Sequence, residues 1–387
     1  MQRYLRYSII RKLPLLIIIS VIFMTIAFVS ASNVEFVRAQ VDGEHVRYFS
    51  EDSGIASLIY TFFGTMLVLP FFSMNYRYSL AKSDTFRQAA FKDKSLRYLE
   101  HLSTLIIVLV SFTISFLIFV SLAAFRNYHV VYLPENTEQV TYYIAYFKYI
   151  YFLPLFFATF VLGICQYFIS YFLISRSNNF LNSLMILTLG EAFLGCFIVI
   201  PMMLIAYNFS SISFGLEGAT FIYPATYLYK QFNELILSGV NPLAEYFTLD
   251  PYNEVRMETV LFIMSGIVFL LLAGFSIFMF ITEKDPSSEW ANKPQAPNMY
   301  QEIIFHLGFL ALGSVINMGL HATDSILSII VYYVLFSSSY YTLYGLLNRN
   351  FKLKPYQIII LASVTLTTGV LAFAYWLRKA AELNYYF

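Results

Sequence analysis

Residues 76–102 read YRYSLAKSDTFRQAAFKDKSLRYLEHL, the most polar long stretch in a strongly apolar chain. Lysine and arginine outnumber aspartate and glutamate in it by six to three. An apolar run lies on each side, over residues 55–74 and 102–125. Each run is long enough to cross a bilayer as a helix, which takes about 20 residues. The sequence therefore predicts a basic loop between two membrane spans.

The composition of the whole chain indicates a membrane protein. Of 387 residues, 59% are hydrophobic and 12% are charged, which is roughly half the charged share of a soluble domain. We predict an all-α polytopic membrane protein with about nine transmembrane helices, or eight if the last apolar run is re-entrant. The expected spans cover residues 13–31, 55–74, 102–125, 149–174, 181–207, 259–281, 303–320, 326–347 and 358–377.

The distribution of charge predicts which side of the membrane each loop faces. With the N-terminus in the cytoplasm, the inner segments hold 16 basic and 7 acidic residues, and the outer segments hold 8 and 15. Cytoplasmic loops are usually the richer in lysine and arginine. This orientation places the loop at residues 76–102 in the cytoplasm. The basic pair Arg378–Lys379 would lie on the outer side in this orientation, against the rule, which keeps the eight-span alternative open.

A cytoplasmic linker is predicted at residues 283–301, which contain three prolines and no apolar periodicity. It separates a six-span unit at residues 1–282 from an accessory unit of two or three spans at residues 302–387. The role of the accessory unit does not follow from its sequence.

The basic loop itself is predicted to form a short amphipathic helix. Ser83 and Asp84 are good N-cap residues, and no proline or glycine follows before Leu102. Phe86 and Phe91 fall on one side of this helix, and basic residues occupy much of the rest. Two interpretations are open. The helix rests on anionic lipid headgroups, or it docks its aromatic side chains and charges into a cytosolic partner.

The pattern YSL-KSD-T-F-RQ, followed by a basic run that enters a long span, resembles the permease subunits of ABC-2 type exporters. These are the bacterial peptide-antibiotic and bacitracin-type export permeases. The resemblance implies a coupling helix between the second and third spans, seated in a groove of a cytosolic ATPase. The matching coupling residues here are Asp84, Thr85, Phe86, Arg87 and Phe91. Family members often have a proline after RQ, whereas this chain has Ala89-Ala90-Phe91.

The same resemblance implies the function and the partners. We expect a permease in the bacterial cell membrane that exports an amphipathic peptide, an antibiotic or a lipid-like molecule. Its partners would be cytosolic ABC ATPase subunits, a second permease subunit (the same or paralogous) and membrane lipids, with no nucleic acid.

No catalytic role is expected for the chain. It has no GxxxxGK[ST] motif, so ATP and Mg²⁺ would be used by the partner ATPase and no cofactor would be bound here. No metal-ligand spacing is present, and Cys165 and Cys196 both lie in apolar runs as expected of buried free thiols.

Glu191 is the one acidic residue predicted inside a span, next to Gly190 and near Gly195. It is either a structural carboxyl at a tight helix crossing or part of a substrate path or gate. Two other classes of function stay open. An ion- or proton-coupled secondary carrier would carry more charges at mid-membrane, and a non-transporting sensor or scaffold would carry a folded cytosolic module.

Overall fold

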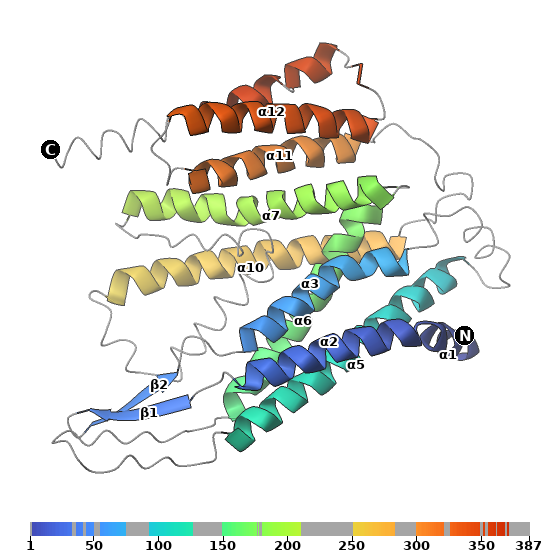
Figure 1. The fold of residues 1–387 in the computed structure, drawn as a ribbon, viewed down its shortest axis with the longest axis vertical. Helices are drawn as coiled ribbons and strands as arrows, with labels where there is room; N and C mark the ends of the chain where they lie inside the picture. The colour runs from blue at the N-terminus through green and yellow to red at the C-terminus, as the bar shows by residue number, and fades with distance from the viewer. Residues whose placement is uncertain are drawn as a thin grey trace. The chain divides into compact units, whose positions relative to one another are not determined.

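The computed structural model describes residues 2–32, 36–41, 44–49, 55–74, 93–126, 149–175, 177, 180–209, 251–282, 299–320, 326–348, 351–352, 355–360, 362–367 and 370. Its long elements are all helices, drawn in Figure 1. The labelled elements are α1 (Gln2–Arg11), α2 (Leu13–Ser32), β1 (Phe36–Val41), β2 (Glu44–Phe49), α3 (Ile55–Ser73), α5 (Asp93–Arg126), α6 (Tyr149–Ser175), α7 (Phe180–Phe209), α10 (Pro251–Thr282), α11 (Met299–Leu320) and α12 (Ile326–Asn348).

Four helices among the described residues are long and apolar enough to cross a membrane. They cover Leu13–Ala31, Ile55–Ser73, Arg97–Phe125 and Phe152–Ser175, close to the first four predicted spans. Helices also occupy the positions of the next four predicted spans, and helical turns lie at residues 355–360 and 362–367. The helical, membrane-type architecture is confirmed, while the count of nine spans and their orientation stay predictions.

Among the described residues, one short antiparallel hairpin interrupts the series of helices. β1 and β2 pair from Phe36↔Phe49 to Val41↔Glu44, within a segment that we predicted only as a loop. The two residues between the strands are Asp42 and Gly43, a pair typical of two-residue hairpin connections.

Contacts group the helices into two compact units. The first contains α1, α2, α3, α5, α10 and most of α6, and the second contains α7, α11 and α12. In the first unit, α2, α3 and α5 pack on one another, and the rings of Phe23, Phe62 and Phe112 meet between them. The rings of Phe62 and Phe112 stack with centroids 4.0 Å apart. Gly163 brings α6 against Phe62, because a Cβ there would lie 2.7 Å from the Phe62 Cζ atom.

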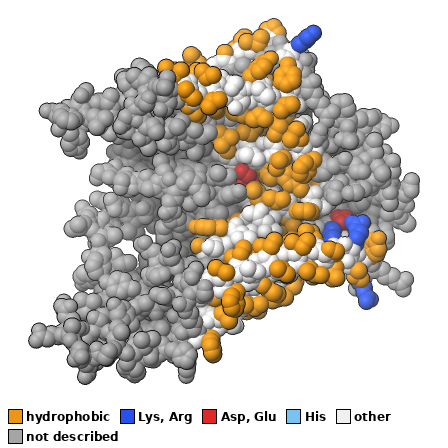
Figure 2. All heavy atoms as spheres, in the orientation of Figure 1, with side chains coloured by type: hydrophobic (Ala, Val, Ile, Leu, Met, Phe, Trp, Pro, Cys, Tyr) orange, Lys and Arg blue, Asp and Glu red, His pale blue; other side chains and the backbone are white. Residues whose placement is uncertain are grey.

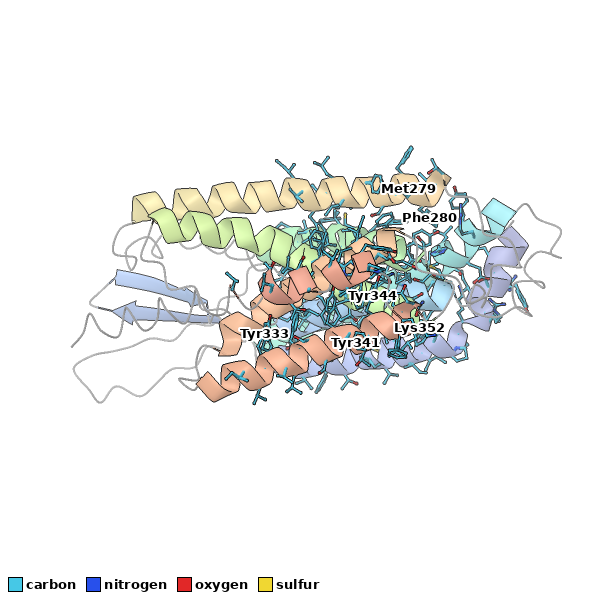
Figure 3. The ribbon with its side chains drawn as sticks, turned by 90° about the horizontal axis from the view of Figure 1, so that it is seen from above. Met279, Phe280, Tyr333, Tyr341, Tyr344 and Lys352 are labelled. Carbon is cyan, nitrogen blue, oxygen red and sulfur yellow. The ribbon has the colours of Figure 1, made fainter. Side chains whose placement is uncertain are left out.

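In the second unit, α7 packs closely along α11. Gly308 of α11 faces the backbone of α7, where a Cβ would lie 2.6 Å from the Cβ of Leu189 and would overlap its carbonyl oxygen. On α12, Tyr333, Tyr341 and Tyr344 lie along the helix (Figure 3). The unit thus joins α7, which precedes the predicted linker, to helices that follow it. Most of residues 283–301 lie outside the described residues, so the predicted boundary there stays a prediction.

Candidate functional site

The predicted coupling residues lie outside the described part of the chain. Asp84, Thr85, Phe86, Arg87 and Phe91 all precede Asp93, where α5 begins. The first described side chain of the opening stretch is Arg97. The site that the structure does describe therefore follows the predicted coupling residues directly in sequence.

A row of polar side chains occupies one face at the start of α5. Arg97, Glu100, His101 and Thr104 have the spacing that places side chains next to one another on a helix. All four are buried. A charge removed from water is unfavourable unless it is paired or hydrogen-bonded, so this row requires partners from other helices. We call Arg97, Tyr98, Glu100, His101, Ser103 and Thr104 the α5 cluster.

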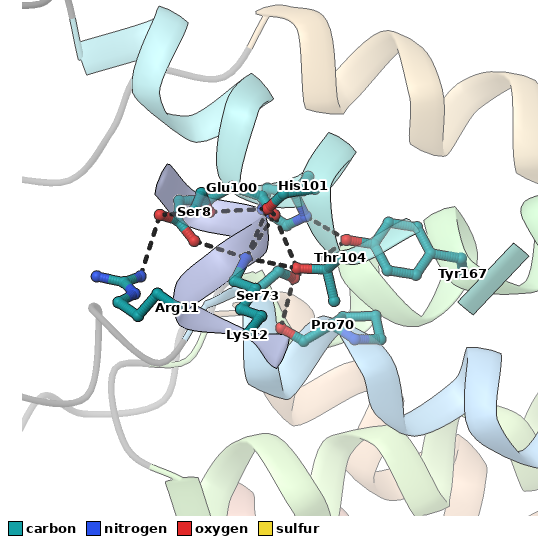
Figure 4. A network of polar contacts seen from close by, with 10 residues as sticks. Ser8, Arg11, Lys12, Pro70, Ser73, Glu100, His101, Thr104 and Tyr167 are labelled. Atoms are coloured by element: carbon teal, nitrogen blue, oxygen red, sulfur yellow. Dashed lines mark hydrogen bonds and ion pairs between the residues drawn. The ribbon is translucent and has the colours of Figure 1, made fainter. Parts of the chain in front are cut away.

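The α1–α2 junction supplies the ionic partners of the cluster (Figure 4). Lys12 Nζ lies 2.7 Å from Glu100 Oε2, and Arg11 Nη2 lies 3.1 Å from Glu100 Oε1. Ser8 Oγ donates to Glu100 Oε1 at 3.2 Å and contacts Ser103 Oγ at 2.9 Å. One carboxylate is therefore shared by two cations and a hydroxyl.

Lys12 is held from several directions at once. Its ammonium also donates to the Glu100 carbonyl oxygen at 2.9 Å, to Ser103 Oγ at 2.8 Å and to Thr104 Oγ1 at 2.7 Å. Since an ammonium has three N–H donors, these acceptors saturate it. Burial lowers the pKa of the Lys12 amine below its ordinary value, and the charge of Glu100 acts in the opposite direction.

The end of α10 supplies aromatic partners. Tyr98 OH donates to the Ile281 carbonyl oxygen at 3.1 Å, and the Phe280 ring, labelled in Figure 3, meets the Tyr98 ring edge-on with centroids 5.2 Å apart. The Arg97 guanidinium carbon lies 5.5 Å from the centroids of both rings. This distance is within the range of cation–π attraction, which strengthens when the cation is desolvated.

α6 and α3 join the cluster through hydroxyl groups. His101 Nδ1 and Tyr167 OH share a hydrogen bond, and Tyr167 OH also lies 3.0 Å from Ser73 Oγ. Ser73 Oγ donates in turn to the Pro70 carbonyl oxygen at 3.0 Å. The chain of contacts from α5 through α6 to the end of α3 is drawn in Figure 4.

The cluster thus ties the start of α5 to the α1–α2 junction, to α10 and to α6, and through Tyr167 of α6 to the end of α3. Glu100 contacts the α1–α2 junction, Arg97 and Tyr98 contact α10, and His101 contacts α6. Displacing α5 alone would break an ion pair, a cation–π pair and a buried hydrogen bond together. The arrangement is suited to carrying a displacement at the start of α5 to its neighbours.

Sequence reasoning missed this cluster, although one signal for it was present. Glu100 and Lys12 were counted only as charges for orientation, and His101, Tyr167 and Phe280 were not singled out. The spacing of Arg97, Glu100, His101 and Thr104 at the polar end of an apolar run was visible. Their partners, far away in sequence, were not.

Glu191 belongs to the second unit. Its side chain is buried on α7, and the neighbouring Gly190 packs against Leu173. The close approach of Gly308 to Leu189 lies nearby on the same helix. These contacts describe a tight helix crossing around Glu191. Both of its interpretations, structural carboxyl and gate, stay predictions.

Among side chains that the structure describes, no group of three or more His, Cys, Asp or Glu residues could hold a metal ion.

No family model, curated protein or solved structure matches the chain. What the site does must therefore be argued from its geometry and from the sequence.

Proposed function

We propose that the chain is the transmembrane permease subunit of an ATP-driven ABC-2 type exporter in a bacterial cell membrane. It would assemble with cytosolic ATPase subunits and a second permease, identical or paralogous. The substrate class suggested by the resemblance is an amphipathic peptide, an antibiotic or a lipid-like molecule. The sequence pattern at residues 76–102 and the helical, apolar architecture support this proposal.

The α5 cluster is the observation that carries the proposal furthest. A coupling segment is useful only if the helix that follows it is mechanically tied to the rest of the membrane domain. Directly after the predicted coupling residues, α5 contacts α1, the α1–α2 junction, α6 and α10 through buried polar and aromatic groups. A helix that merely crossed the lipid would not need such groups at its end.

The proposed mechanism follows from these contacts. Closure of the ATPase subunits on ATP would push the segment that contains Phe86 and Arg87. α5 would move as a rigid rod, and the ion pair at Glu100 and the bond at His101 would carry the α1–α2 junction and α6 with it. The path for substrate would then open between the two permeases.

The decisive experiment compares aromatic and charged residues of the coupling segment. Phe86→Ala and Arg87→Ala should each weaken co-purification of the ATPase subunit and lower its substrate-stimulated ATP hydrolysis. Truncating a central interface residue commonly costs about 2 kcal/mol, or roughly a thirtyfold loss of affinity.

Lys92→Ala and Lys94→Ala serve as matched controls from the same stretch. They should have much smaller effects, because they lie further along the stretch than Phe86 and Arg87 and are expected to be more exposed. Small and equal effects at all four positions would instead indicate that the segment rests on lipid, and the exporter proposal would lose its residue-level support.

A further inference from the structure

The helix α1 divides into two faces of opposite character. Ser8 is buried toward α5, with Leu5 and Ile9 partly covered on the same side. The opposite face presents Arg6, Tyr7, Ile10 and Arg11, all exposed. Figure 2 shows basic side chains gathered where Figure 1 draws α1, next to an extended apolar surface.

The exposed face combines apolar and basic side chains, a combination that is unfavourable both in water and in hydrocarbon. Tyr7 is 59% exposed and Ile10 is 57% exposed, which is unfavourable in water. Arg6 and Arg11 stand next to them and would be unfavourable inside hydrocarbon. The boundary between headgroups and acyl chains suits both kinds at once, as in helices that lie in the membrane interface.

The position of α1 in the chain agrees with such a boundary. α1 ends at Arg11, and the first apolar span begins at Leu13. Leu13, Ile17 and Ile18 continue the exposed apolar surface along α2. The arginines of α1 therefore lie within about two helical turns of the first apolar span.

The local charge balance selects an anionic ligand. Arg11 and Lys12 share the single carboxylate of Glu100, which leaves one positive charge in excess. Arg6, which takes no part in those ion pairs, adds a second. The Arg11 side chain is 54% exposed, so its guanidinium can reach a ligand from outside the cluster. Guanidinium groups bind phosphate with two parallel hydrogen bonds.

We propose that the exposed face of α1 is a binding site for anionic phospholipid, with Arg6 and Arg11 on the lipid phosphate and Tyr7 and Ile10 among the first methylenes of the acyl chains. The site does not depend on the exporter function. It assigns α1 to the membrane surface, where a lipid of negative charge fixes the helix.

The test uses full-length protein with Tyr7→Trp as a reporter, in uncharged detergent micelles. Phosphatidylglycerol or phosphatidylcholine carrying bromine near the headgroup end of the acyl chains is titrated in, and quenching of tryptophan fluorescence is measured. The protein without the reporter gives the background from Trp290 and Trp376. Each basic residue near an anionic surface contributes about fivefold to binding. We expect half-quenching at a roughly thirtyfold lower concentration of phosphatidylglycerol than of phosphatidylcholine.

Substitution of the arginines tests whether the preference for phosphatidylglycerol arises from α1. Arg6→Gln should reduce the preference about fivefold, and Arg6→Lys should retain most of it, because charge contributes most of the preference. Lys352→Gln, at an exposed lysine of the second unit, is the matched control and should change nothing. Arg6 is the cleaner site for the test, since Arg11 also contacts Glu100.

Native mass spectrometry provides a second readout that does not need the reporter. Protein purified from membranes containing both lipids should retain phosphatidylglycerol, and Arg6→Gln should retain less of it. Equal quenching by the two lipids, or a preference that survives Arg6→Gln unchanged, would overturn the proposal. An acidic protein segment would then be the better occupant for this face.

Discussion

Removing one partner of the Glu100–Lys12 pair should destabilise the protein more than removing both. The proposed changes are Glu100→Met and Lys12→Met, singly and together. Methionine approximates the length of both side chains and removes their charge. The reasoning rests on burial, since the side chains of Glu100 and Lys12 are only 6% and 11% exposed.

The expected magnitude follows from the contacts. Glu100→Met leaves the Lys12 ammonium buried beside hydroxyl and carbonyl oxygens but without a counter-charge. Breaking a buried pair from one side typically costs about 3–5 kcal/mol of unfolding free energy. Replacing both partners with apolar residues of similar size is often close to neutral. The double variant should therefore recover most of the stability that Glu100→Met loses.

The control is Arg11→Met, which removes the other cation on the same carboxylate. Its side chain is 54% exposed and lies 3.1 Å from Glu100, so its loss should cost only about 0–1 kcal/mol. Unfolding of the purified protein in mixed micelles, followed by circular dichroism as denaturing detergent is added, gives the free energies to compare. If Glu100→Met is no worse than Arg11→Met, or if the two single costs simply add in the double variant, the buried-pair argument is refuted.

Three further predictions concern other parts of the chain. Gly308→Ala should destabilise α7–α11 packing by roughly 1–3 kcal/mol, whereas Gly274→Ala, with open space around it, should unfold like the native protein in thermal scans. If Glu191 is a gate, Glu191→Gln should fold normally but lower transport. If Glu191 is structural, Glu191→Gln should keep both folding and transport intact, whereas Glu191→Leu should lose thermal stability. Cys165 and Cys196 are first replaced, single cysteines are introduced, and impermeant maleimide is applied to intact cells. It should label the two positions predicted outside and should not label the two predicted inside. Labelling of position 84 from outside would contradict the predicted orientation. The outer positions are Asp42 and Asn241, and the inner positions are Asp84 and Lys352.

The features that the sequence predicted well are local ones. The first span, residues 13–31, was placed by its run of apolar residues, and a helix that crosses a bilayer needs no information beyond that run. The hairpin was missed even though its signal is also local. Asp42-Gly43 between short segments rich in β-branched and aromatic residues is a recognised hairpin pattern.

The features that the sequence could not predict depend on distant partners. The spacing of Arg97, Glu100 and His101 marks a polar helix face, yet nothing in it identifies Lys12, Phe280 or Tyr167 as the partner of each. The packing of α7 on α11 also depends on residues that are far apart in sequence. Gly308 appears in sequence as a weak helix former, and only the fold shows that a side chain there would meet the backbone at Leu189.

The lipid site proposed on α1 and the α5 cluster share one residue, and their energies decide how they interact. Arg11 contributes at most about 1 kcal/mol to its exposed contact with Glu100, so a lipid phosphate can draw the guanidinium away at little cost. Lys12, buried and saturated with acceptors, keeps the carboxylate paired when Arg11 leaves. Anionic lipid can therefore bind α1 without loosening α5 from the α1–α2 junction. In the proposed exporter, lipid would act on this ion pair through α1, and the coupling segment would act on it through α5.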